Sequence, residues 1–245
     1  MMRFFVAVCL LAFAAPAAHA GGFNLTWGTG CWRENPATLH SFACDSNDGS
    51  ASFTVSFAPD RNLDNFNSFY AVLNLQSDSP NMPDWWQLTH LGGCRDGALS
   101  TSAEFAAVPG GCADPWQGQI PSYSITWRTA LFPGVGYGDI LAPNRAQFRV
   151  SYGTAPPLPL VIGAEYYGFR ATINYQKTVG ADACGGCRTP VILVLNEVTL
   201  VARVPNVLTG PLDNMCLHWQ AAGATPCNAT PVRNRTWGQL KSLYR

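Results

Sequence analysis

Short segments of this chain alternate between apolar and polar residues, and turn-forming residues separate them. Residues 52–57 alternate strictly, as Ser-Phe-Thr-Val-Ser-Phe, and in residues 69–75 every second position is Phe, Ala or Leu. A period of two residues predicts a β-strand with one buried face. Further candidate strands lie at residues 24–27, 103–107, 122–127, 147–152 and 165–175.

The most apolar segment after the N-terminal region is residues 191–204, which Asn196, Glu197 and Thr199 interrupt. It predicts a central strand that is covered on both faces. No convincing amphipathic helix precedes the C-terminal residues. The pattern therefore predicts an all-β fold, a two-sheet sandwich or jelly roll with long disulfide-stapled loops, that occupies residues 21–232 as one domain.

Residues 233–245 differ in character and predict a short C-terminal helix. Thr236 is followed three residues later by Gln239, the spacing of a capping box. Trp237, Leu240 and Tyr244 then fall on one helical face. This helix either caps one end of the sandwich or serves as a sorting or recognition element.

Residues 1–20 have the three-part pattern of a cleaved secretory signal peptide. Arg3 supplies a positive start, residues 4–15 are apolar, and small residues at Ala18 and Ala20 precede the predicted cleavage before Gly21. The apolar run is shorter than the roughly 20 residues of a membrane span. The pattern predicts a secreted, periplasmic or cell-surface protein without a transmembrane anchor after cleavage.

The cysteines fit an oxidising compartment. The chain has nine, and removal of residues 1–20 takes away Cys9, so that an even number remains. Their spacing groups them into neighbouring couples. This grouping predicts the disulfides Cys31–Cys44, Cys94–Cys112, Cys184–Cys187 and Cys216–Cys227.

The Cys184-Gly185-Gly186-Cys187 sequence has two other interpretations, a redox pair and half of a zinc site. A redox pair needs a helix after its first cysteine, and a strand-like segment follows instead. A zinc site needs further ligands, and no second pair of this spacing is present. A structural disulfide is the favoured interpretation.

Charge and motifs exclude several functions. The chain carries 15 Lys and Arg against 15 Asp and Glu, a balance that argues against a nucleic-acid partner. No cofactor-binding fingerprint is present. Residues 45–49 (Asp-Ser-Asn-Asp-Gly) resemble the start of a calcium loop but lack its alternation and its distal Glu, so a plain turn is favoured over a weak calcium site.

No catalytic motif is present, and an enzyme is the less favoured class. Glycoside hydrolysis would need two carboxylates in one cleft. The strand-associated acids are Glu104, Glu165 and Glu197. Glu197 stands out among apolar neighbours, although an outward-facing acid on a half-exposed strand is the simpler interpretation.

The tryptophans, eight in all, suggest a carbohydrate-binding module, because sugars stack on exposed aromatic rings. Trp85 and Trp86 follow a proline-rich loop, and Trp116 lies in Asp114-Pro115-Trp116. These three residues are the candidate aromatic platform, although adjacent residues on a strand face opposite ways, so that one of Trp85 and Trp86 is expected in the core.

Four segments resemble exported proteins of environmental, high-GC bacteria for which no activity is assigned. They are residues 83–86, residues 112–116, residues 177–187 and the terminal residues 234–245, which include Thr-Trp-Gly-Gln-Leu-Lys-Ser-Leu-Tyr-Arg. The resemblance implies export and a bacterial origin, and it carries over no site residues. The leading hypothesis is a non-catalytic extracellular binding or surface protein, whose partner is carbohydrate or a cell-surface component. The alternative is a carbohydrate-binding module or a glycoside-active enzyme.

Overall fold

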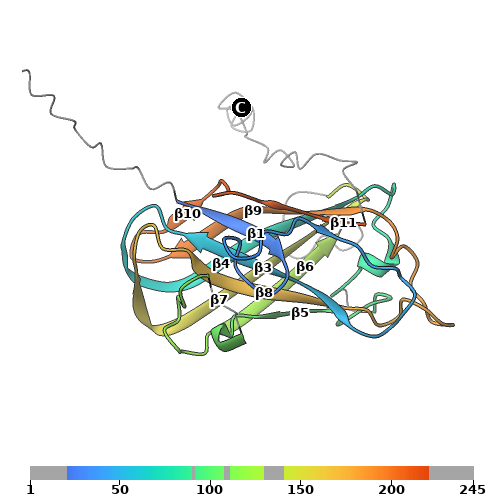
Figure 1. Cartoon of the computed structure of the whole chain (residues 1–245), viewed down its shortest axis with the longest axis horizontal. Helices are drawn as coiled ribbons and strands as arrows, with labels where there is room; N and C mark the ends of the chain where they lie inside the picture. The colour runs from blue at the N-terminus through green and yellow to red at the C-terminus, as the bar shows by residue number, and fades with distance from the viewer. Residues whose placement is uncertain (1–20, 90–91, 108–110, 130–140, 221–245) are drawn as a thin grey trace, which may run out of the picture.

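A computed structural model describes residues 21–89, 92–107, 111–129 and 141–220 of the chain, which form two packed β-sheets (Figure 1). Sheet A is antiparallel, with its strands in the order β1-β3-β8-β5. The bounds of these strands are Gly22–Trp27 (β1), Ser50–Ala58 (β3), Tyr166–Asn174 (β8) and Leu99–Ser102 (β5).

Sheet B has the order β2-β11-β9-β4-β7-β6, and β10 also pairs with β9. Only the short β2–β11 pair is parallel. The bounds are Leu39–His40 (β2), Cys216–Trp219 (β11), Val191–Val201 (β9), Leu63–Ser77 (β4), Arg145–Leu160 (β7), Ser122–Thr129 (β6) and Asn206–Leu208 (β10). The all-β, two-sheet prediction is confirmed.

The core lies between the inner faces of the two sheets and is rich in aromatic rings. Phe69 of β4 packs on Phe57 of β3 and on Phe169 of β8, with ring centroids 5.2 and 5.9 Å apart. Gly168 permits this approach, because a Cβ there would lie 3.1 Å from the Phe69 ring and 2.9 Å from a backbone oxygen. The inner face of β4 is fully buried, whereas its alternate residues are half-buried, as the period of two predicts.

Segment 191–204 is the predicted central strand, and β9 does lie between β11 and β4 with residues 191–195 all buried. Segment 103–107 is not a strand. The Ser102 hydroxyl accepts a hydrogen bond from the backbone N–H of Glu104 at 3.1 Å, which turns the chain into the 3₁₀ helix η2 (Phe105–Ala107). A second 3₁₀ helix, η1, covers Asp84–Trp86. Among the described residues, neither of these short helices could cross a membrane.

Three disulfides join parts of the chain that are far apart in the sequence, and the predicted local pairs Cys31–Cys44, Cys94–Cys112 and Cys184–Cys187 are wrong. The bridges are Cys31–Cys112, Cys44–Cys187 and Cys94–Cys184, with sequence separations of 81, 143 and 90 residues.

The strand order explains the correction. β2 lies between Cys31 and Cys44 in the sequence and pairs with β11. This pairing brings Cys44 to the 184–187 loop and away from Cys31. Cys31 stays near Cys112, whose neighbour Ala113 bridges to Tyr166 at the start of β8. Cys184 and Cys187 therefore each hold a different loop to the same end of the sandwich.

Three predictions fall outside the described residues. These are the signal peptide at residues 1–20, the helix at residues 233–245 and the partner in the Cys216–Cys227 pair. Cys216 itself, in β11, is disulfide-bonded.

Candidate functional site

The tryptophans predicted to form an exposed platform are buried, and that prediction is wrong. Trp85 and Trp86 have no exposed surface, and Trp116 is 1% exposed. Trp85 and Trp86 lie in η1 and pack on each other and on Trp219 of β11. A strand would have sent adjacent rings to opposite faces, but the 3₁₀ turn directs both inward. Trp116 packs on Phe66 of β4, with ring centroids 5.2 Å apart.

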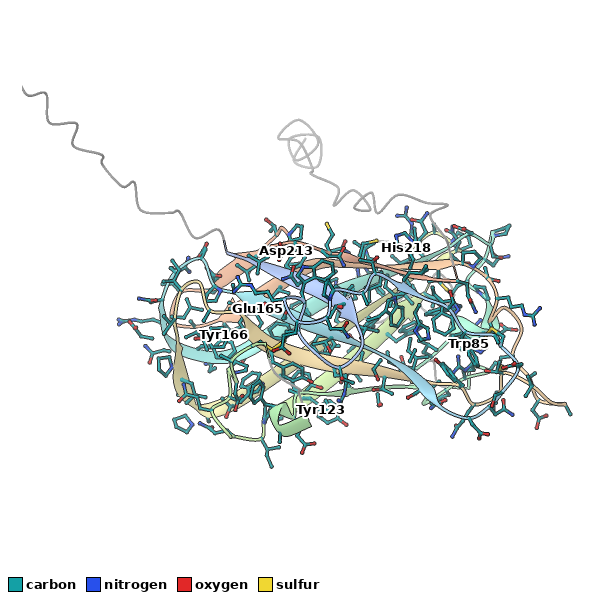
Figure 2. All side chains as sticks on the ribbon, in the orientation of Figure 1. Trp85, Tyr123, Glu165, Tyr166, Asp213 and His218 are labelled. Carbon is teal, nitrogen blue, oxygen red and sulfur yellow. A yellow bond between two sulfur atoms is a disulfide. The ribbon has the colours of Figure 1, made fainter. Side chains whose placement is uncertain are left out.

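A buried arginine holds η1 in place. The guanidinium carbon of Arg95 lies 3.7 Å from the centroid of the Trp85 ring, and Nη1 donates to the Trp85 carbonyl at 2.9 Å. Burial lowers the pKa of Arg95 to about 10. This cluster is structural, because both side chains are enclosed in the core at the end of the sandwich where Figure 2 labels Trp85.

The strand-associated acids do not converge. Glu197 is half-exposed on β9 and accepts a hydrogen bond from Thr199 at 3.0 Å. Glu165 lies just before β8 with its side chain 1% exposed. Glu104, which is exposed, lies beyond β5 at the rim of a cleft.

Glu165 is the centre of a polar network between the sheet and the 28–38 loop. Its Oε1 accepts hydrogen bonds from Ser56 Oγ at 2.5 Å and Asn24 Nδ2 at 3.2 Å, and Arg33 Nε lies 3.4 Å from Oε2. Asn24 Nδ2 also lies 3.4 Å from Asp213 Oδ2, so one amide joins two carboxylates. Asn24 Oδ1 accepts the backbone N–H of Asp213, which fixes the amide with its donor side toward both acids. Because a donor occupies the space between the carboxylates, the arrangement suits a structural anchor.

The loop at residues 45–49 is a turn. Asn47 Oδ1 accepts the backbone N–H groups of Thr178 and Val179 at 2.8 and 3.0 Å, and Ser46 Oγ accepts the N–H of Asp48. These contacts direct the Asn47 side chain at the neighbouring loop. Across the described part of the chain, no group of three or more His, Cys, Asp and Glu residues is placed to hold a metal ion.

A cleft of about 620 Å³ opens at one side of the sandwich, between the edge strands of the two sheets. Tyr152 of β7 reaches across to sheet A, where its hydroxyl donates to Thr101 Oγ1 of β5 at 2.8 Å. β6 lies one strand further out than β7, whereas sheet A ends at β5. The inner face of β6 therefore extends past sheet A, and the cleft lies beneath it.

Two tyrosines on β6 and β7 line the cleft, together with Phe105 on the wall opposite the 114–121 loop. Tyr123 of β6 is paired directly with Tyr152 of β7, so both rings lie on the inner face, with centroids 5.9 Å apart. Tyr152 is 3% exposed, and its burial raises its pKa to about 12. Tyr123 is 65% exposed and projects at the lower side of the molecule in Figure 2. Tyr123 is thus the most exposed aromatic ring of the cleft.

One wall of the cleft is the loop from Asp114 to Pro121. Asp114 accepts the backbone N–H groups of Trp116 at 2.8 Å and Gly118 at 2.6 Å, one on each carboxylate oxygen. These bonds set a tight turn, which presents Gln119 and the 96% exposed Ile120 at the cleft. Thr154 of β7 donates to Gln119 Oε1 and so fixes the amide.

The opposite wall runs from Thr101 to Ala106. Tyr167 of β8 donates to the Ser102 carbonyl at 2.9 Å, and the Phe105 ring packs on Tyr167 with centroids 6.1 Å apart. Glu104 is exposed between these residues. Among the described residues that line the cleft there are two carboxylates and no Lys or Arg. The cleft thus combines aromatic rings, hydroxyl and amide groups, and negative charge.

Comparison of the chain with protein-family models, with curated proteins and with solved structures finds no match. The case for this site therefore rests on its own residues.

Sequence reasoning missed the cleft although it contains Asp114 and Glu104. Tyr123 lies in a segment correctly predicted as a strand, but its alternation gives no sign that the strand extends past the opposite sheet. The turn signal Asp-Pro-Trp-Gln-Gly at residues 114–118 marks one wall of the cleft and is the one local signal for it.

Proposed function

We propose that this chain is an exported, non-catalytic bacterial protein that binds carbohydrate in the cleft between β5 and β6. The observation that carries the proposal is the Tyr123 ring, 65% exposed at a cleft whose walls carry hydroxyl, amide and carboxylate groups. Sugars combine an apolar ring face with many hydroxyls, and such a ligand matches both components.

Export is supported by two features that agree. The pattern of residues 1–20 is that of a signal peptide. Three disulfides with long sequence separations fit a protein that folds in an oxidising compartment. The resemblance of residues 234–245 to exported bacterial proteins points the same way.

The charge of the cleft indicates which sugars it accepts. Glu104 and Asp114 line it, and no described lining residue is cationic. A uronate or sulfated glycan would place its charge near these acids without a counterion. We therefore expect neutral glycans to bind and anionic glycans to be rejected.

The test is a glycan array followed by calorimetry on the exported protein and on two variants. Tyr123→Ala removes the ring and should weaken binding at least about tenfold, on the scale of a lost aromatic stacking contact. Tyr123→Phe keeps the ring and should bind within about threefold of wild type. Val204→Ala, at an exposed site in the β9–β10 turn, is the control. Absence of any glycan ligand, or equal binding by Tyr123→Ala, would overturn the proposal.

A glycoside-active enzyme is the second candidate, because Glu104 and Asp114 both line the cleft. Each oxygen of Asp114 already accepts a backbone N–H, which leaves this carboxylate ill suited to act as nucleophile or base. Binding without turnover is therefore the favoured function. If the protein releases reducing ends from a bound glycan, and Glu104→Gln abolishes this release, the enzyme becomes the favoured function.

A further inference from the structure

β6 forms a long, regular outer edge of sheet B. Its eight residues pair with β7 from Ser122 to Thr129 without a register shift, and no strand formed by the described residues lies on its other side. Every second residue of such a strand directs both its N–H and its C=O away from β7. None of the backbone hydrogen bonds of the described residues uses these outward groups between Ser122 and Trp127.

Three of the other sheet edges are short or covered. β5 has four residues and β2 has two. The outer side of β1 is occupied by loops, since Phe23 N, Leu25 N and Trp27 N donate to carbonyls of residues 210, 214 and 37. Within the part of the chain that the structure describes, no loop backbone is hydrogen-bonded to the outer side of β6.

The first six residues of β6 also lack the devices that block edge pairing. Residues 122–127 (Ser-Tyr-Ser-Ile-Thr-Trp) include no proline and no charge, and Ser122, Tyr123, Ser124 and Thr126 are exposed. Natural proteins usually blunt an exposed edge with lysine, proline or a bulge. An edge left open over this length is a surface for strand pairing.

We propose that a second copy of this chain pairs with this edge, β6 against β6 and antiparallel, about a two-fold axis at Ile125. Such an axis, perpendicular to the sheet, keeps inner faces together and joins the two copies of sheet B into one sheet. Tyr123 then lies opposite Trp127 of the second copy, and Ser124 lies opposite Thr126 of the second copy. Cross-strand aromatic and hydroxyl pairs of this kind stabilise antiparallel sheets.

The composition of the strand favours a second copy as the occupant. Because residues 122–127 are uncharged, the two-fold places no like charges opposite each other, and Arg128 falls opposite Ser122 of the second copy. The midpoint of β6 lies between Ile125 and Thr126, so axes at these two residues give the greatest overlap. Ile125 is favoured because it brings the apolar inner-face residues Tyr123, Ile125 and Trp127 into register.

The test uses sedimentation velocity over a range of concentrations. Wild type should dimerise. Ile125→Lys and Ile125→Glu each place like charges directly opposite at the axis and should weaken dimerisation at least about tenfold. An equimolar mixture of the two variants should restore a heterodimer, because Lys then faces Glu. Val204→Lys, an apolar-to-charged change at an exposed site away from β6, should leave the dimer intact.

A second measurement needs no variant. Backbone amides at alternate positions of residues 122–127 should exchange more slowly with solvent as wild-type concentration rises. A monomeric wild type at all concentrations would overturn the proposal, as would a dimer that Ile125→Lys leaves unchanged. A mixture of variants that stays monomeric would reject the Ile125 axis. Glycan binding is measured separately, so failure of the dimer leaves the proposed function standing.

Discussion

Glu165 illustrates at the scale of one residue how a carboxylate is kept inside this sandwich. Ser56 and Asn24, both buried in adjacent strands, direct donors at one of its oxygens, and the exposed Arg33 approaches the other. A buried acceptor that loses its donors carries the full cost of desolvation. The buried donors therefore matter more than the surface ion pair.

Glu165→Ala should lower the free energy of unfolding by about 2–4 kcal/mol, because it leaves the buried Ser56 hydroxyl without its acceptor and Asn24 with only the 3.4 Å contact to Asp213. Arg33→Ala should cost less than about 1 kcal/mol, since the side chain is 59% exposed and the pair is screened. Guanidinium unfolding of both variants measures the difference. Equal losses would mean that the ion pair, and not the buried network, holds the loop.

The sequence does not distinguish Glu165 from Glu104 and Glu197, because all three accompany strands. In the structure Glu165 is buried, Glu104 lines the cleft and Glu197 is half-exposed on β9. Asn24, Ser56 and Glu165 are far apart in the chain, and only the pairing of β1, β3 and β8 brings them together. Composition and spacing contain no record of that pairing.

At the scale of elements, the disulfides hold the loops at the ends of the strands. Cys44–Cys187 and Cys94–Cys184 attach two loops to the same four-residue segment, beside the Trp85 and Trp219 rings. Trp219 Nε1 donates to the Cys187 carbonyl at 2.8 Å, which ties this segment to β11. The long separations make each bridge a larger constraint on the unfolded chain than the local pairs would have been.

Replacing Cys31 and Cys112 together by serine should cost about 4–5 kcal/mol, the value of the chain-entropy model for a loop of this length, against about 3 kcal/mol for a local pair. Denaturant unfolding of the double variant measures the loss. Mass spectrometry of non-reduced peptides provides the control, because it should recover a Cys31–Cys112 peptide. Recovery of a Cys31–Cys44 peptide would contradict the structure.

At the scale of the whole molecule, buried tyrosines make the free energy of unfolding depend on pH in the alkaline range. Burial raises the pKa of Tyr152 to about 12 and also raises the pKa values of Tyr167 and Tyr175 above their ordinary value of 10.0. In the unfolded chain these phenols ionise near pH 10, whereas the folded chain keeps their protons. Folding stability from these groups is therefore complete below about pH 10 and is lost as pH rises toward the folded pKa values.

The free energy of unfolding should fall from about pH 10 to pH 12, and Tyr152→Phe should show a smaller fall over that range. At neutral pH the variant should lose about 1 kcal/mol, because its hydrogen bond to Thr101 is gone. Denaturant titrations at stepped pH, with tyrosinate absorbance followed in parallel, measure both effects. A variant with the same alkaline slope as wild type would show that Tyr152 is not a source of the dependence.

The sequence by itself determined the class of fold and most of the strands, because the alternation that buries one face of a strand is a local property. Segments 52–57, 69–75, 122–127 and 147–152 all lie within strands of the structure. Strand neighbours, disulfide partners and the direction of Trp85 and Trp86 were decided by tertiary structure alone. All three features depend on which distant segments of the chain come into contact. The spacing of residues within one segment carries no information about such contacts. Tertiary structure also decided the cleft and the open edge of β6. Both exist because β6 extends sheet B one strand beyond β5, the last strand of sheet A.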